Sequence, residues 1–184
     1  MNPLVKNLLI WKGKLFFKPK LFSFINDLSQ AHSMLILLPH QTESFSSVFN
    51  HLSPLENIFS DLKISYLLPF SSQGFVSSFK NHDVISLKKE EMGWWGLPKG
   101  GFTRRLRDYR FDISLDLDLS KNFLNVYLGL ISEAKVRMGV QKKAGPPFYN
   151  MELIIPSHLL YLDEQYDSII KILKNLRIKK TVEA

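Results

Sequence analysis

The sequence predicts an α/β fold with one Rossmann-like, mostly parallel sheet, for three reasons. Short apolar runs alternate with segments of helical periodicity along most of the 184 residues. Hydrophobic residues make up 45% of the chain and charged residues 22%, which is the composition of a folded globular protein. The chain shows no internal repeat and no interdomain linker. We therefore expect one domain at residues 33–184, preceded by a basic, aromatic-rich segment at residues 1–32.

Each expected strand is a short run, either apolar throughout or alternating, that is bounded by turn residues. The run MLILLP is apolar throughout and ends at Pro39, which is typical of a buried strand. The run FDISLDLDL instead alternates apolar and polar residues, which predicts one face on the core and a polar, partly covered face. In chain order, the expected strands are residues 34–39, 63–70, 83–87, 111–119, 134–140 and 150–156.

The expected helices place apolar residues three or four positions apart. The last one is the clearest, because Leu162, Tyr166, Ile169 and Leu173 fall on one stripe. In chain order, the expected helices are residues 40–52, a helix that starts at 53–56, a short basic helix at 102–110, and residues 121–132 and 157–176. Glycines and a proline predict a loop at residues 93–101.

Three aspartates share the polar face of the strand at 111–119. From Asp112 to Asp118 such a strand extends roughly 20 Å, at about 3.3 Å per residue. Oxygen ligands of a cation must instead converge to within about 2.6 Å of one point, so we expect no metal site. Asp116 and Asp118 lie near the carboxyl end of the strand, where they could meet a ligand in a cleft or cap the next helix.

The net charge of +7 is concentrated at the two ends of the chain. Residues 1–32 hold five lysines and one aspartate, and residues 171–184 hold five basic residues and one glutamate, a net of +4 in each case. The first segment either lies on an anionic membrane as an amphipathic surface or packs on the domain as a helix. Its membrane or partner surface would comprise Lys6, Trp11, Lys12, Lys14, Lys18 and Lys20. No recognisable nucleic-acid module accompanies this charge, so nucleic acid is not an expected partner.

Several classes of protein are excluded by composition. The chain has no cysteine, which rules out disulfides and thiolate metal sites. No apolar run reaches the roughly 18 residues of a membrane span, and the N-terminus lacks a secretory cleavage pattern. We therefore expect a cytoplasmic protein, with the inner face of the membrane as a further location. Gly100 and Gly101 lack the spacing of a phosphate loop or a dinucleotide fingerprint, and we expect no cofactor.

Trp94 and Trp95 stand between two glycines. Adjacent tryptophans of this kind could stack on a sugar, anchor the protein in a membrane or form part of a protein interface. The simplest interpretation is that both belong to the core and close a loop.

Three stretches resemble a known enzyme family. A basic helix runs into the strand that begins with Phe111-Asp112 and contains Asp116-Leu117, and a leucine-rich helix then leads to Arg137-Met138-Gly139. The tail DEQYDSIIKILKNLRI and the early stretch MLILLPHQTESFSSV complete the pattern. Over about residues 33–178 the chain resembles heptosyltransferase-type glycosyltransferases of family nine.

The resemblance implies one half of a GT-B architecture, in which two Rossmann-like halves face a cleft. It implies the acceptor-side half, without the half that grips a nucleotide sugar. The family carries a Gly-Asp pair in its first loop, and the corresponding pair here is Glu43-Ser44. A serine hydroxyl has no useful basicity at neutral pH, which leaves Glu43 as the one candidate base.

Two hypotheses follow from this resemblance. The chain is either a non-catalytic binding or interaction protein, with another chain or a second copy of itself as partner, or a glycosyltransferase whose donor half is a separate chain. The candidate ligand-binding residues are His40, Glu43, Ser44, Trp94, Trp95, Asp116 and Asp118.

Overall fold

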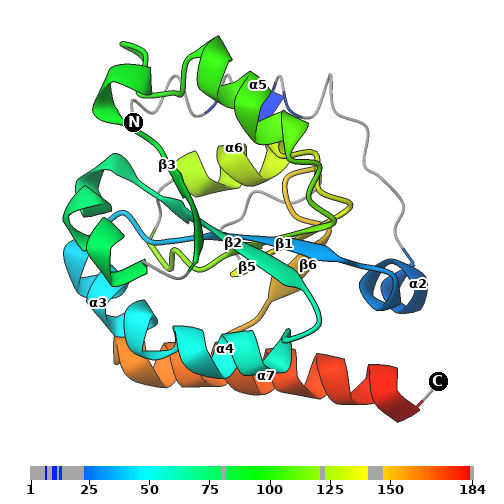
Figure 1. Ribbon diagram of the computed structural model, residues 1–184. Coiled ribbons are helices and arrows are strands. Elements are labelled where there is room, and N and C mark those ends of the chain that lie inside the picture. The colour runs from blue at the N-terminus through cyan, green and yellow to red at the C-terminus, as the bar shows by residue number, and fades with distance from the viewer. Residues whose placement is uncertain are drawn as a thin grey trace.

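The computed structural model describes residues 23–79, 82–120, 123–140 and 147–182, together with Asn7, Ile10, Trp11 and Gly13. Within them, six parallel strands form one sheet in the order β3-β2-β1-β4-β5-β6 (Figure 1). The strands are β1 (Ser33–Leu37), β2 (Lys63–Leu68), β3 (Asp83–Ser86), β4 (Ile113–Asp116), β5 (Val136–Val140) and β6 (Met151–Leu153). Every expected strand is present, and the predicted α/β class with a parallel sheet is confirmed.

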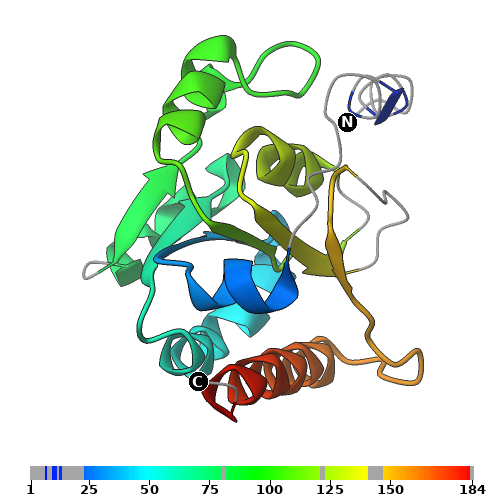
Figure 2. The same cartoon turned by 90° about the vertical axis from the view of Figure 1, so that its right-hand side faces the viewer.

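Helices cover both faces of the sheet (Figures 1 and 2). One face carries α3 (Thr42–Asn50), α4 (Leu52–Ile58) and α7 (Leu162–Val182), and the other carries α5 (Gly100–Asp108) and α6 (Leu124–Ile131). Side chains of β1 alternate between these layers: Met34 and Ile36 join the first core, and Leu35 and Leu37 join the second. A short helix, α2 (Phe24–Ser29), precedes the sheet, and two 3₁₀ helices, η1 (Phe70–Phe79) and η2 (Lys89–Glu91), flank β3.

The polar face of β4 is more deeply covered than its alternation predicts. Ser114 and Asp116 are both buried, as is every other residue of this strand. Helix α6 packs on this face, since a Cβ atom built on Gly129 would be in ordinary van der Waals contact with Ser114 Oγ, at 3.5 Å. Because a parallel sheet is sandwiched between helices, its central strands have no face open to solvent. The expectation that the polar face of this strand is only partly covered is therefore wrong.

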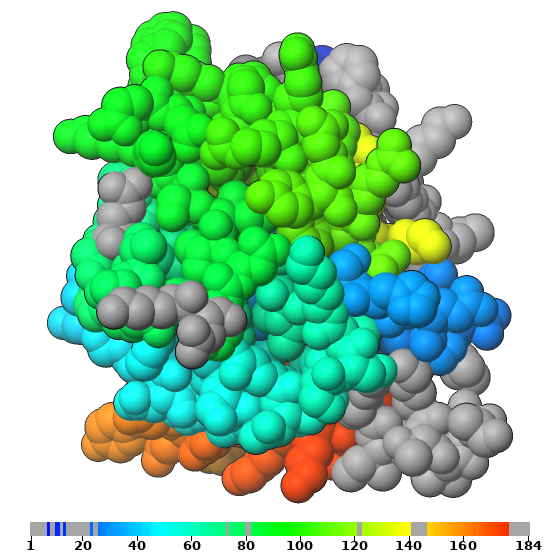
Figure 3. Space-filling view, in the orientation of Figure 1, coloured from blue at the N-terminus to red at the C-terminus, as the bar shows by residue number. Residues whose placement is uncertain are grey.

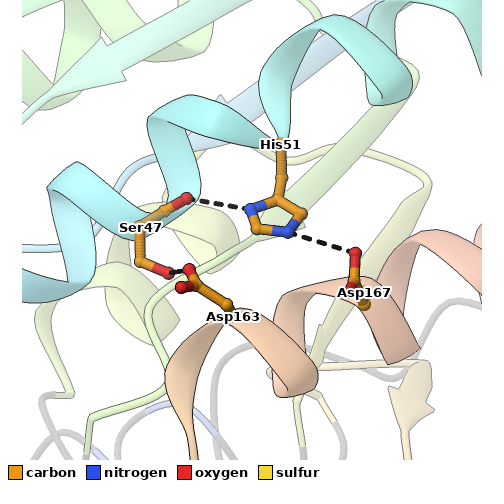
Figure 4. A network of polar contacts seen from close by, with 4 residues as sticks. All are labelled: Ser47, His51, Asp163 and Asp167. Atoms are coloured by element: carbon orange, nitrogen blue, oxygen red, sulfur yellow. Dashed lines mark hydrogen bonds and ion pairs between the residues drawn. The ribbon is translucent and has the colours of Figure 1, made fainter.

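Helix α7 begins at Leu162 rather than at the expected residue 157, and polar contacts fasten it to α3 (Figure 4). The His51 ring lies 2.9 Å from Ser47 O through Nδ1 and 3.2 Å from Asp167 Oδ1 through Nε2. Ser47 Oγ donates to Asp163. Through its two ring nitrogens His51 therefore bridges the backbone of α3 and a side chain of α7.

Part of the N-terminal segment contacts the domain. Ile10 packs against the cluster around Phe148, and a Cβ on Gly13 would lie 2.5 Å from Phe148 Cζ. Trp11 remains 59% exposed. The lysines expected to form a membrane or partner surface (Lys6, Lys12, Lys14, Lys18 and Lys20) lie outside the described residues. None of the helices in the described ranges is long and apolar enough to cross a bilayer.

Candidate functional site

The strand order places a candidate site between β1 and β4. The chain leaves β1 towards α3 on one face of the sheet and leaves β4 towards α6 on the other. Where successive connections diverge in this way, a crevice opens at the carboxyl ends of the strands, and doubly wound folds bind ligands there.

Asn125 is the centre of a polar network at this point. Its Nδ2 atom donates to Leu38 O at 3.0 Å and to Asp116 Oδ1 at 3.1 Å. Its Oδ1 atom lies 2.9 Å from His40 Nε2. We call His40, Asp116, Asp118, Asn125 and Tyr149 the switch-point cluster.

The network fixes the protonation of one histidine nitrogen. Leu38 O and the Asp116 carboxylate only accept hydrogen bonds, so the amide nitrogen of Asn125 must face them. The amide oxygen therefore faces His40, and His40 Nε2 carries a proton. Ser71 Oγ also donates to His40 O at 2.8 Å, which ties the β1 loop to the start of η1.

Tyr149 closes the cluster from the far side of Asp116. Its hydroxyl donates to Asp116 Oδ2, and burial, then the Asp116 charge, hold its pKa well above the usual range. Gly139 makes room for the ring, because a Cβ there would lie 2.6 Å from Tyr149 Cζ. The phenol is thus a neutral donor at ordinary pH.

Asp118 lies beside Asp116 and is equally enclosed. Its amide donates to Asp116 Oδ1 at 2.9 Å, and its own Oδ1 accepts from Ser120 N at 2.8 Å. Its Oδ2 atom is buried and has no hydrogen-bond partner among the described residues. The part of the chain that the structure describes contains no group of three or more histidine and carboxylate side chains able to hold a metal ion.

The residues that the sequence predicts to bind a ligand differ in how deeply they are buried. Asp116 and Asp118 are 0% exposed, and Ser44 is buried within α3. His40 is half-buried, and Glu43 is exposed in the first turn of α3. His40, Asp116 and Asp118 therefore belong to one site, but the two aspartates support it from inside rather than line its surface.

Trp94 and Trp95 are not core residues. They are 86% and 50% exposed, so the simplest interpretation of their sequence is wrong. Their turn follows β3 and η2, so it leaves the sheet at the same edge as the switch-point cluster.

Sequence reasoning missed Asn125 and Tyr149. Asn125 carried a signal, since it is a polar residue in the otherwise apolar helical stretch LNVYLGLI. Tyr149 follows a glycine–proline stretch, and no pattern in the sequence points to its contact with Asp116.

The sequence matches no protein-family model and no curated protein, so the chain can be compared with known proteins only through its fold. Among solved structures, the chain is similar to a family 9 glycosyltransferase from Veillonella parvula, with a TM-score of 0.62 and 16% identity, over 86% of this chain and 43% of that one. Its fold is that of one half-domain of such enzymes.

Two Escherichia coli enzymes give the same result. ADP-heptose lipopolysaccharide heptosyltransferase II matches with a TM-score of 0.57 and 14% identity, over 75% of this chain and 40% of that one. Heptosyltransferase WaaC, solved with ADP, matches with a TM-score of 0.54 and 16% identity, over 80% of this chain and 46% of that one. The chain spans less than half the length of each enzyme, and the likeness is one of fold.

Proposed function

We propose that this chain is a non-catalytic binding protein built on the acceptor-side half-domain of a glycosyltransferase. The burial of the carboxylates at the switch point is the observation that supports this proposal. A general base must come within about 2.6–3.2 Å of the hydroxyl it deprotonates. Asp116 and Asp118 are 0% exposed and engaged with protein groups, so neither reaches a ligand in the crevice.

The polar groups at the carboxyl ends of β1 and β4 suit a neutral, hydroxyl-rich ligand such as a sugar. His40 is half-buried and held by Asn125, and the β1 loop is tied to η1 by Ser71. Fixed polar side chains that are oriented in advance give hydroxyl ligands their specificity, because a mismatched ligand leaves a buried polar group unpaired.

A second function rests on Glu43. This carboxylate is exposed in the first turn of α3, next to the β1 loop. It could accept a proton from an acceptor hydroxyl if a separate chain supplied the donor half of a transferase.

Ligand titration with transfer assays separates the two functions. Calorimetry with simple sugars, sugar phosphates and nucleotide sugars would be run on the wild-type protein, His40→Ala and the control His158→Ala, which changes an exposed histidine in the loop before α7. We expect sugar binding that His40→Ala abolishes and His158→Ala leaves intact, with no turnover.

Three results would count against the binding proposal. If the wild-type protein binds no sugar, or if His40→Ala leaves sugar binding intact, there is no sugar site at His40. Nucleotide-sugar binding at about millimolar affinity or tighter, with glycosyl transfer that Glu43→Gln abolishes, establishes the transferase instead.

A further inference from the structure

A hydrogen-bonded turn before α5 presents tryptophans to solvent. Gly93 N donates to Leu97 O at 2.7 Å, and Met92 and Pro98 form an antiparallel bridge at the base. Gly96 adopts a φ of 75°, which a residue with a side chain rarely takes. We call residues 93–98 the tryptophan turn. It is ordered by its own backbone, so its side chains do not need to pack on the core to hold its shape.

The exposure of tryptophan here is unusual. All three tryptophans of the chain are exposed: Trp11 by 59%, Trp94 by 86% and Trp95 by 50%. Tryptophan is highly buried on average in soluble proteins. In Figures 1 and 2 the turn projects beyond the helical layer at the outer end of α5, and the described residues of the N-terminal segment lie at the same end of the molecule.

The chain segment that contains the tryptophan turn is basic. Residues 88–110 hold seven lysines and arginines and three acidic residues, a net of +4. Arg105 pairs with Glu91 at 2.8 Å and Arg107 with Glu133 at 2.9 Å. Arg104 is exposed and forms no ion pair with a described residue, so its charge is available to an anionic partner.

We propose that the tryptophan turn and the exposed arginines of α5 form a contact surface for an anionic lipid bilayer. Indole rings favour the bilayer interface, and neighbouring cations gain from anionic headgroups. The surface is convex: Figure 3 shows the green atoms of this region standing out at the upper left margin of the molecule. A convex aromatic tip in a basic chain segment fits insertion into an interface.

The same geometry disfavours two other partners. Single-stranded nucleic acid stacks its bases on open ring faces along a groove, whereas the rings of Trp94 and Trp95 lie against each other with centroids 3.9 Å apart. Sugar sites are concave and hold their ligand with converging polar groups, which a projecting turn lacks. The proposal goes beyond the ligand site at the switch point and does not depend on it.

Vesicle co-sedimentation of the full chain tests the surface. The vesicles contain phosphatidylcholine alone or mixed with phosphatidylglycerol. We expect binding to the anionic vesicles only, and a fall of at least about tenfold in the partition coefficient for Trp94→Ser/Trp95→Ser. The matched control, Leu160→Ser/Tyr161→Ser, removes two other exposed apolar side chains, which are 79% and 72% exposed, and should bind as the wild-type protein does.

Charge reversal supplies a second, independent readout. Arg104→Glu should weaken binding at about 0.1 M salt and have little effect at about 1 M, where the screening length falls from about 10 Å to about 3 Å. The proposal is overturned by equal binding to neutral vesicles, or by an unchanged partition coefficient for the tryptophan variant. Loss of binding on deletion of residues 1–22, with the tryptophan variant unaffected, would assign the anchor to the N-terminal segment. Binding of single-stranded nucleic acid but not of vesicles would also contradict the proposed lipid surface.

Discussion

Replacing Tyr149 by phenylalanine should destabilise the fold by about 2 kcal/mol. The change keeps the buried ring and removes only the hydroxyl that donates to Asp116 Oδ2, at a site where Asp116 is 0% exposed. Loss of one partner from a buried hydrogen bond costs about 1–3 kcal/mol, and more when the group left behind is charged. Because the apolar area is unchanged, nearly all of this cost belongs to the hydrogen bond.

Urea denaturation of the wild-type protein, Tyr149→Phe, Asp116→Asn and the double variant measures this cost. The double variant should lose less than the sum of the single losses, by about 1 kcal/mol or more, because the two groups interact directly. Tyr161→Phe is the control, since its ring is 72% exposed and its loss should stay within about 0.5 kcal/mol. A Tyr149→Phe variant as stable as that control, or strict additivity in the cycle, would refute the hydrogen-bond reasoning.

Three further predictions concern packing, pH and the helix fastening. Gly139→Ala should cost about 1–3 kcal/mol in thermal unfolding, because its Cβ would lie 2.6 Å from the buried Tyr149 ring. Burial raises the pKa of Tyr66, Tyr149 and Tyr166 above the ordinary value of 10.0, so stability is retained below pH 10 and falls above it. The slope should approach about 1.4 kcal/mol per pH unit for each tyrosine, with ionisation at 295 nm delayed until unfolding. His51→Ala should lower the free energy of unfolding by about 1–2 kcal/mol in urea denaturation, through its contacts with α3 and α7.

The strands were predictable because the hydrophobic pattern of a few consecutive residues is enough to indicate a buried strand. Apolar or alternating runs bounded by turn residues located all six, including the edge strands β3 and β6. Residues 70–79 gave no such signal, since FSSQGFVSSF has neither helical nor strand periodicity, and the structure forms a kinked 3₁₀ helix there. Such segments follow from what surrounds them, here Phe45 and Tyr66, which contact the rings of Phe75 and Phe79.

The candidate site was only half predictable, because part of it depends on contacts between residues far apart in the sequence. The position of Asp116 and Asp118 at the carboxyl end of a central strand follows from the alternation in the sequence and the parallel sheet. Their enclosure depends on Asn125 and Tyr149, and Tyr149 lies 33 residues beyond Asp116. The exposure of Trp94 and Trp95 also escaped prediction, because a tryptophan pair in a core loop and one on a solvent turn have the same sequence.

Stability measurements bear on function, because a side chain at the carboxyl ends of these strands cannot easily both stabilise the fold and act on a ligand. Residues that act on ligands commonly reduce stability, so their replacement tends to be neutral or stabilising. Glu43→Gln should therefore change the free energy of unfolding by no more than about 0.5 kcal/mol, since Glu43 is exposed. Asp116→Asn should destabilise, because the carboxylate accepts from Asn125, Tyr149 and Asp118 N. A stabilising Asp116→Asn would mean that the buried charge is maintained at a cost, and would make Asp116 a functional group rather than a structural one.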